Sequence, residues 1–417
     1  MSVMADLLGT LFERRYRAGA PDPRALPELS RALVEARAEG PGGELARALL
    51  DRYAAAERDE RLAWFTFLAE EMDLDTAALT DALATYAEDS DPEAYRRLAA
   101  LSEPPRQELA RRLNQVPGAT AQLVAMRADL LSMIPDAPGL QRVDLDFRHL
   151  FKSWFNRGFL VLRPITWESP AHILEKIIAY EAVHEIHSWD DLRRRLEPAD
   201  RRCFAFFHPS MPDEPLIFVE VALTTAVPGS IQALLSEDRA QIDPGQATTA
   251  TFYSISNCQD GLAGISFGNF LIKQVVRDLQ RDLPQITRFV TLSPIPGLCA
   301  WTAETGLDWP DDGAAQAALA AHYLLKAKGR GTAPRDPVAR FHLGNGALVH
   351  AVHSGADTSD NGRRQSGGVM VNYLYDLDRI AENHARFHDD GTIAASRDMV
   401  SLAKRAPMPR LEQTETT

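Results

Sequence analysis

The sequence predicts an α+β protein of two parts, an all-α helical bundle followed by a mixed β-sheet domain with flanking helices. Residues 1 to about 140 are rich in Ala, Leu, Arg and Glu, and their apolar residues recur at helical spacing. Beyond this point, segments with strand composition alternate with helical segments, and two of the strands form a hairpin pattern. The chain of 417 residues is also longer than one typical domain.

Short helices account for the first part. Leu7, Leu8, Leu11 and Phe12 show the helical spacing, and breakers such as Pro104-Pro105 separate one helical segment from the next. These breakers indicate about eight helices, whose many arginines we expect on solvated faces in pairs with acidic residues. We expect residues 1–142 to form this bundle and to serve as an oligomerisation domain.

The second part, residues 143–408, is expected to carry the chemistry, and residues 409–417 to be a disordered tail. After a helix over 144–155, its expected strands cover 158–163, 202–208, 215–223, 248–256, 286–293 and 369–375, with a further strand or buried segment over 347–353. Its expected helices cover 172–182, 270–281, 314–327, 376–387 and 393–404.

Composition excludes several classes of function. A formal charge of −13 without a Lys/Arg-rich block argues against a nucleic-acid partner, although an anionic ligand needs only a local group of donors. Three widely spaced cysteines form neither a disulfide framework nor a metal pair, which indicates a reducing cytoplasm. The sequence also shows no signal peptide and no apolar run of membrane-spanning length.

Ser293 stands where a predicted strand meets a turn. The run from Ile286 is β-branched and aromatic, and Pro294 and Pro296 stop it, because proline donates no ladder hydrogen bond. Ser293 is therefore expected at the carboxyl end of a strand, where open α/β sheets bind ligands. A serine in an ordinary proline-rich turn is the alternative.

A glycine-rich entry to a helix comes shortly before this strand. Gly261, Gly264 and Gly268 permit close backbone approach, and a helix N-terminus attracts phosphate. The segment lacks the Gly-Lys-Ser/Thr ending of a Walker loop, and its spacing does not fit a dinucleotide fingerprint. It is either a ligand cradle or a turn, and its place between a strand and an amphipathic helix favours the cradle.

His342 is one of 11 histidines and is distinguished by its setting. Gly344, Asn345 and Gly346 follow it and predict a tight turn beside the imidazole. His184 and His187 could be read as a metal pair, but helical zinc pairs are usually four residues apart with a third ligand nearby. No metal site is therefore predicted.

Together these segments resemble the malonyl-CoA decarboxylase family over most of residues 145–405. The resemblance rests on Leu-Ser-Pro-Ile-Pro-Gly at 292–297, Gly-Asn-Phe-Leu-Ile-Lys at 268–273, Phe-His-Leu-Gly-Asn-Gly-Ala at 341–347 and Val-Asn-Tyr-Leu-Tyr at 371–375. The order of elements also resembles the GNAT acyltransferase fold, in which two central strands splay apart around the pantetheine arm of CoA. The splay is expected between 248–256 and 286–293.

The resemblance implies a role for each matched residue. It makes Ser293 the proton acceptor and His342 the proton donor, with Tyr375 and Asn372 supporting the pair. It implies that substrate is bound by Ser293, His342 and the loop Ala263, Gly264, Ile265, Ser266, Phe267, Gly268 and Asn269. Animal members carry a glutamate where this chain has Ser266, so a carboxylate contribution to the Ser/His network is in doubt.

The resemblance therefore implies decarboxylation of malonyl-CoA to acetyl-CoA and CO₂ by a cytoplasmic homotetramer. It implies no metal, biotin or pyridoxal cofactor, and no membrane partner. Two alternatives use the same predicted CoA site, namely a GNAT-type acyltransferase with an amine acceptor and a non-catalytic CoA-binding regulator.

Overall fold

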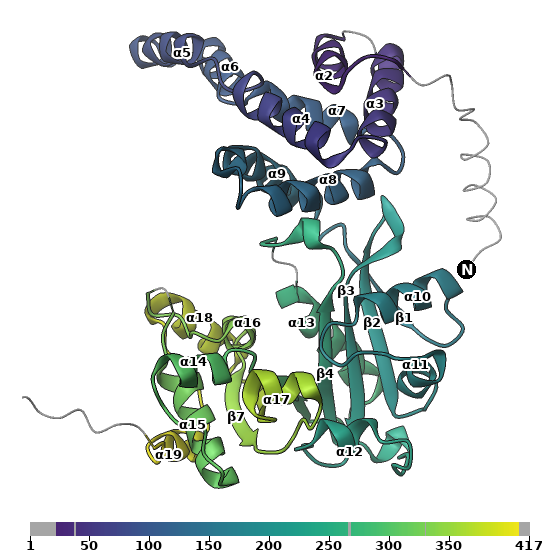
Figure 1. The fold of residues 1–417 in the computed structure, drawn as a ribbon, viewed down its shortest axis with the longest axis vertical. Helices are drawn as coiled ribbons and strands as arrows, with labels where there is room; N and C mark the ends of the chain where they lie inside the picture. Colours follow the sequence, from purple (N-terminus) through teal and green to yellow (C-terminus); the bar gives the residue numbers. More distant parts are fainter. Residues whose placement is uncertain (1–21, 37–38, 266–267, 330, 408–417) are drawn as a thin grey trace, which may run out of the picture. The chain divides into compact units, whose positions relative to one another are not determined.

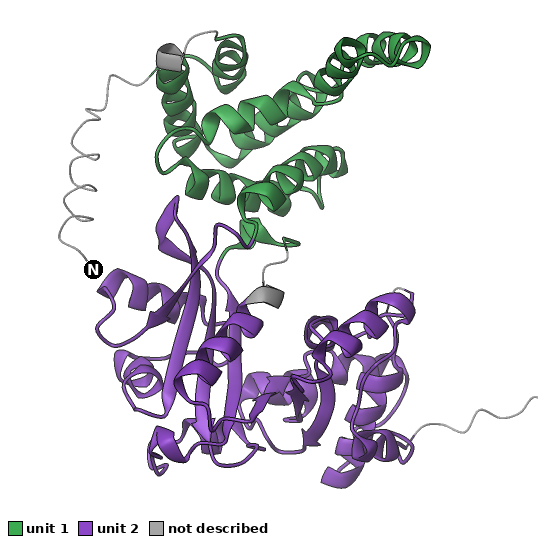
Figure 2. Cartoon of the chain, turned by 180° about the vertical axis from the view of Figure 1, so that it is seen from behind, with its two compact units in different colours: residues 1–156, 259–265 green, residues 157–258, 266–417 purple. Residues whose placement is uncertain are grey.

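The computed structural model describes residues 22–36, 39–265, 268–329 and 331–407. The chain divides into two compact units (Figure 2). Unit 1 comprises residues 1–156 and a returning segment, 259–265, whereas unit 2 comprises residues 157–258 and 266–417. The predicted boundary at residue 142 falls inside a helix of unit 1, and the predicted tail from residue 409 lies outside the described residues.

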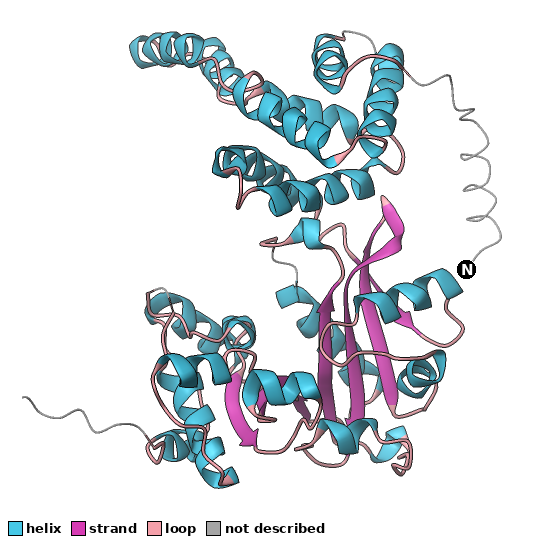
Figure 3. Cartoon of the chain, viewed as in Figure 1, coloured by secondary structure: helices cyan, strands magenta, loops and turns pink. Residues whose placement is uncertain are grey.

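Among its described residues, unit 1 contains helices and no strand (Figure 3). The caps agree with the local sequence, because the side chains of Asp75 and Asp91 accept hydrogen bonds from the first backbone N–H groups of α5 and α6. The helices are α2 (Leu26–Glu35), α3 (Glu39–Ala54), α4 (Arg58–Glu70), α5 (Thr76–Glu88), α6 (Pro92–Leu101), α7 (Pro105–Leu113), α8 (Ala119–Met133), the 3₁₀ turn η1 (Pro138–Leu140), α9 (Gln141–Trp154) and the 3₁₀ turn η3 (Asp260–Leu262).

The expectation that the arginines of this part lie on solvated faces is wrong for two of them. Arg106 and Arg127 are buried. Arg106 Nη1 lies 2.8 Å from Asp73 Oδ1, and Arg127 Nε lies 2.7 Å from Asp144 Oδ1. A buried guanidinium needs such partners, because desolvation without them costs several kcal/mol.

Arg127 also holds the start of the glycine-rich segment on unit 1. Its Nη1 donates a 2.6 Å hydrogen bond to the carbonyl oxygen of Gly261 in η3. A Cβ on Gly261 would lie 1.8 Å from the carbonyl oxygen of Val124 in α8, so only glycine fits this approach. The segment 259–265 is therefore packed into the helical unit.

Unit 2 is built on an eight-stranded mixed sheet (Figure 1). The strands run in the order β1-β2-β3-β4-β5-β8-β6, and β7 also pairs with β8. Apolar, aromatic and β-branched residues predominate in them, as predicted, but β3 and β4 are buried along most of their length and not on alternate residues only. The strands are β1 (Val161–Ile165), β2 (Arg201–His208), β3 (Met211–Thr224), β4 (Thr249–Asn257), β5 (Arg288–Thr291), β6 (Ser293–Pro294), β7 (Leu348–His353) and β8 (Met370–Leu374).

Helices connect and cover these strands. α10 and α11 pack on β2 and β3 over an apolar cluster that includes Ile177, Leu192, Ala205 and Phe218. The described helical segments of unit 2, these two included, connect strands or follow the last one. They are α10 (Ala171–Tyr180), α11 (Trp189–Leu196), α12 (Ile231–Leu235), η2 (Pro244–Gln246), α13 (Gly268–Asp282), α14 (Leu298–Glu304), α15 (Gly313–Lys326), α16 (Pro337–Gly344), α17 (Asp360–Ser366), α18 (Ile380–Asp390) and α19 (Arg397–Ala403).

Two central strands of this sheet stop pairing with each other partway along their length. β4 and β5 pair in parallel, and their register ends at Phe252 and Thr291. Beyond that point β4 pairs only with β3, whereas Ser293 and Pro294 pair with β8. A helical bundle followed by a mixed sheet with flanking helices confirms the predicted fold class.

The structure corrects two local predictions. The expected strand 286–293 is interrupted at Leu292, so Ser293 lies in a separate two-residue strand. No helix was predicted before the turn at residues 344–346, but α16 carries His342 in its last turn and ends at Gly344, the first residue of that turn. At Gly346, with φ +87°, a Cβ would lie 2.1 Å from the carbonyl oxygen of Ile380.

In the part of the chain that the structure describes, none of the helices has both the length and the apolar composition to cross a bilayer.

Candidate functional site

Ser293 and His342 meet in the interior of unit 2. Ser293 Oγ lies 3.3 Å from His342 Nε2, although 49 residues separate them in the sequence. The two residues are 6% and 3% exposed. Ser293 is supplied by β6 and His342 by α16, so the contact depends on the packing of α16 against the sheet.

Hydrogen bonds around the pair assign its protons. The hydroxyl of Ser293 donates to Thr291 Oγ1 at 2.8 Å, and therefore accepts from His342 Nε2–H. The hydroxyl of Tyr375 lies 2.8 Å from His342 Nδ1 and donates to it, since the ring proton is then on Nε2. This assignment makes His342 a donor directed at Ser293.

Burial keeps this imidazole uncharged. It lowers the pKa of His342 from 6.5 to about 3, because the charged ring would lose its hydration. Burial also raises the pKa of the Tyr375 hydroxyl, and the nearby Asn345 amide acts in the opposite direction. At neutral pH the imidazole of His342 and the phenol of Tyr375 are therefore both uncharged.

A cavity of about 240 Å³ opens onto Ser293 and His342. It lies where β4 and β5 separate, and its lining is largely apolar apart from the pair and Asn257. The lining residues are Val183, Ile217, Phe252, Tyr253, Ile255, Asn257, Ser293, Pro294, Pro337, Val338, Phe341 and His342. A cavity with an apolar wall and few polar groups is typical of a small-molecule site.

Part of the cavity wall presents an unpaired strand edge. Cys258 N donates to Leu216 O, so the backbone of alternate residues of β4 points toward β3. The backbone groups of Ile255 and Asn257 consequently point the other way, toward the cavity that these residues line. No described strand pairs with β4 along this edge beyond Phe252.

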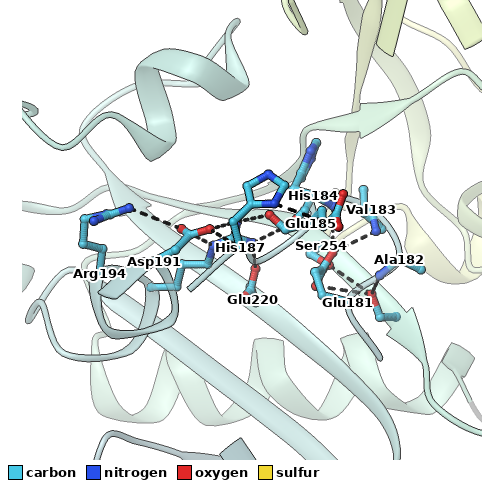
Figure 4. Close-up of polar contacts among 12 residues, drawn as sticks. Glu181, Ala182, Val183, His184, Glu185, His187, Asp191, Arg194, Glu220 and Ser254 are labelled. Carbon is cyan, nitrogen blue, oxygen red and sulfur yellow. Dashed lines mark hydrogen bonds and ion pairs between the residues drawn. The ribbon is translucent and has the colours of Figure 1, made fainter. Parts of the chain in front are cut away.

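Glu181 ties two parts of this wall together (Figure 4). Its carboxylate accepts 2.8 Å hydrogen bonds from the backbone N–H groups of Val183 and His184. It also accepts from the hydroxyl of Ser254 in β4, at 2.7 and 2.8 Å from its two oxygens. The segment containing Val183 is thereby fixed to the strand that forms the cavity edge.

Sequence reasoning missed three residues that support the pair. Thr291 accepts the Ser293 hydroxyl, and Tyr373 stacks on the His342 ring with centroids 4.6 Å apart. Asp336 caps α16 by accepting from Ala339 N, and burial raises its pKa to about 6. The signals were present, because residues two apart on a strand share a face and Asp-Pro is typical of a helix start.

Asn372 is close in sequence to Tyr375 but has other partners. Its side-chain nitrogen donates to Thr291 O at 2.8 Å, and its oxygen lies 2.6 Å from His353 Nε2. Asn372 therefore fixes β8 beside the segment that carries Ser293, and none of these hydrogen bonds involves the Ser/His pair.

The predicted substrate loop is divided between the two units. Ala263, Gly264 and Ile265 belong to unit 1, whereas Gly268 and Asn269 begin α13 in unit 2. Ser266 and Phe267 lie outside the described residues.

His184 and His187, the candidate metal pair, lie in different environments. His187 is 75% exposed, whereas burial lowers the pKa of His184 to about 4. Within the described ranges, no group of three or more His, Cys, Asp or Glu side chains is placed to hold a metal ion.

Comparison with known proteins gives matches along most of the chain. Residues 158–315 and 313–413 match the malonyl-CoA decarboxylase C-terminal domain, and residues 73–155 match the N-terminal domain of the same family. A goose (Anser anser anser) protein named malonyl-CoA decarboxylase, mitochondrial, is 36% identical over 71% of this chain and 69% of its own length. A mouse protein of that name is 34% identical over 70% of this chain and 69% of its own length.

Solved structures agree with these matches. A crystal structure of malonyl-CoA decarboxylase from Rhodopseudomonas palustris is 50% identical, with a TM-score of 0.85, and covers 92% of this chain and 100% of its own. The corresponding Agrobacterium vitis structure is 48% identical, with a TM-score of 0.86 and coverage of 91% and 99%.

Removing the Glu181 carboxylate should weaken the fold around the cavity. Glu181→Ala leaves two backbone donors and a buried hydroxyl without their acceptor, which should lower the free energy of unfolding by about 3 kcal/mol. Glu185→Ala, which removes an 80% exposed carboxylate four residues away, should change it by less than about 0.5 kcal/mol. Urea denaturation measures both, and equal losses would contradict the role assigned to Glu181.

The buried imidazole should make stability depend on acid. Because the pKa of His342 is about 3 when folded and 6.5 otherwise, the unfolded chain binds the extra proton and stability falls as pH drops from 6.5 toward 3. The slope from this group reaches about 1.4 kcal/mol per pH unit. His342→Gln should flatten the curve of unfolding free energy against pH in this window, whereas His187→Gln, the exposed control, should not. An unchanged slope in His342→Gln would contradict the burial of a neutral ring.

Proposed function

Because the chain belongs to the malonyl-CoA decarboxylase family, we propose that it converts malonyl-CoA to acetyl-CoA and CO₂ with Ser293 and His342 as the reacting pair. The observation that carries this proposal is the buried contact of 3.3 Å between Ser293 Oγ and His342 Nε2 at a cavity of about 240 Å³. Both residues lie within the stretch that matches the family's C-terminal domain.

Decarboxylation requires that the electron pair of the breaking C–C bond pass into the thioester. CO₂ leaves, and these two electrons form an enolate whose charge rests largely on the thioester oxygen. In our proposal the Ser293 hydroxyl turns from Thr291 to the substrate carboxylate and holds its C–C bond out of the carbonyl plane. Backbone N–H groups facing the thioester oxygen would each lower the barrier by about 3 kcal/mol.

His342 then supplies the proton that completes the methyl group. The neutral ring can do so because a thioester enolate is a stronger base than the imidazolate that would remain. As Nε2 gives its proton to carbon, the Tyr375 hydroxyl stabilises the negative charge on Nδ1, and a proton from water then restores Nε2–H. A positioned proton donor of this kind contributes about 10²–10⁴-fold to the rate.

Substrate binding follows from the parted strands. The free edge of β4 at residues 255 and 257 supplies backbone groups suited to the amides of the pantetheine arm. We assign the glycine loop Ala263–Asn269 to the CoA phosphates, since glycines and a helix start suit anions. Its first three residues are held on α8 through Arg127 and Gly261.

The proposal includes a homotetramer in the cytoplasm. A helical unit that carries none of the reacting residues has the composition of an assembly surface, and all three cysteines are free. Light scattering of the full chain measures the state directly, and a monomer at micromolar concentration would contradict it.

The proposed reaction is tested by incubating the purified protein with malonyl-CoA and no acceptor. Acetyl-CoA and CO₂ should form in equal amounts, with or without EDTA, because the family resemblance implies no cofactor. An acyltransferase would need an amine acceptor, and a CoA-binding regulator would form no product. Activity lost with EDTA and restored by zinc would contradict the cofactor-free proposal.

Single substitutions should separate chemistry from binding. Ser293→Ala and His342→Ala should each lower kcat by at least about 100-fold with little change in KM, because both act on the transition state. The double variant should fall well short of the product of the two losses, since the residues act as one unit. Independent, multiplicative losses would contradict a concerted pair.

A further inference from the structure

A second cavity in unit 2 lies away from the Ser/His pair, between α15 and α19. Its volume is about 500 Å³, against about 240 Å³ for the cavity at Ser293, and the two share no lining residue. Its apolar surface comes from Leu325, Ile393, Val400 and Ala403. Val400 is 44% exposed, so apolar side chains of this groove face water.

Three ammonium groups surround this apolar surface. Lys326, Lys328 and Lys404 line the groove, and none of its lining residues is acidic. Among the described residues none of these three lysines forms an ion pair, whereas Lys176 forms one with Glu214. Burial and the charge of Lys326 both lower the pKa of Lys328, which places two of the ammonium groups within electrostatic reach of each other. An anion in the groove would relieve this repulsion.

The two features together specify a class of ligand. An alkyl chain would cover Leu325, Ile393 and Val400, and an anionic head group would be needed for the three lysines. A purely inorganic anion leaves the apolar surface in water, and an uncharged lipid leaves the lysines unpaired. We propose that this groove binds an amphipathic carboxylate, a molecule of the fatty-acid class, at a site separate from the catalytic cavity.

The groove has a structural route to the catalytic pair. His322, another lining residue, stacks on Trp301 with ring planes at 22° and centroids 6.2 Å apart. Trp301 belongs to α14, which begins five residues after Ser293, and it also packs against Tyr323. A ligand in the groove would therefore contact α15. The rings of α15 pack against Trp301 of α14, and α14 is the helix that follows the strand carrying Ser293.

Calorimetric titration of the full chain with decanoate, below its micelle concentration, tests the proposal. Decanoate should bind saturably, and decan-1-ol and acetate, which lack the charge and the chain respectively, should each bind at least tenfold more weakly. Replacing Lys326, Lys328 and Lys404 together by Ala should weaken decanoate binding about tenfold, since each exposed ion pair contributes about two- to fivefold. Val400→Asp should weaken it further, whereas Lys152→Ala, an exposed lysine of α9, is the matched control and should have no effect.

Three results would overturn the proposal. The first is displacement of decanoate by malonyl-CoA in direct competition, which would place it in the catalytic cavity. The second is equal affinity of the triple lysine variant and Lys152→Ala. The third is a change of oligomeric state in the triple variant, which would make the groove an interface between copies of the chain.

Discussion

The burial of one uncharged imidazole is the constraint on which the site depends. His342 is 3% exposed, and its two ring nitrogens face Ser293 and Tyr375, so both nitrogens of the neutral ring are hydrogen-bonded to protein groups without water. Tyr373 stacks on it, and Asp336 caps the helix that carries it. A solvated histidine would take up a proton near pH 6.5 and would lose the neutral donor that the proposed chemistry uses.

The parted strands provide the other half of the site. Because β4 and β5 stop pairing at Phe252 and Thr291, a cavity opens next to the short strand that carries Ser293. Glu181 then fixes the Val183 segment, which lines the cavity, to β4. The chain also gives residues 259–265 to the helical unit, through the buried Arg127, so the helical unit holds the first residues of the proposed substrate loop.

Much of the fold could be predicted from local sequence, because strands and amphipathic helices leave periodic patterns. The hairpin of β2 and β3 is one example, and β8, expected at 369–375 and found at Met370–Leu374, is another. α16 was missed because its eight residues are too few for a period, although Asp336-Pro337 marks its start. The roles of Glu181 and Arg127 could not be assigned, since Glu181 bonds Ser254, 73 residues away, and Arg127 bonds Gly261, 134 residues away, and only the tertiary fold brings these residues together. Ser293 and His342 were found through family motifs, and no pattern in the sequence gives the distance between them.

The central claim is that Ser293 and His342 decarboxylate the substrate directly, through an enolate and without a covalent intermediate. The most direct measurement is turnover of malonyl-CoA in D₂O, quenched within one turnover and analysed by mass spectrometry of both product and protein. The account predicts acetyl-CoA with a single solvent deuterium added to its methyl group, and a Ser293 peptide of unchanged mass. A malonyl or acetyl adduct on Ser293 that forms and decays as fast as the product appears would contradict it.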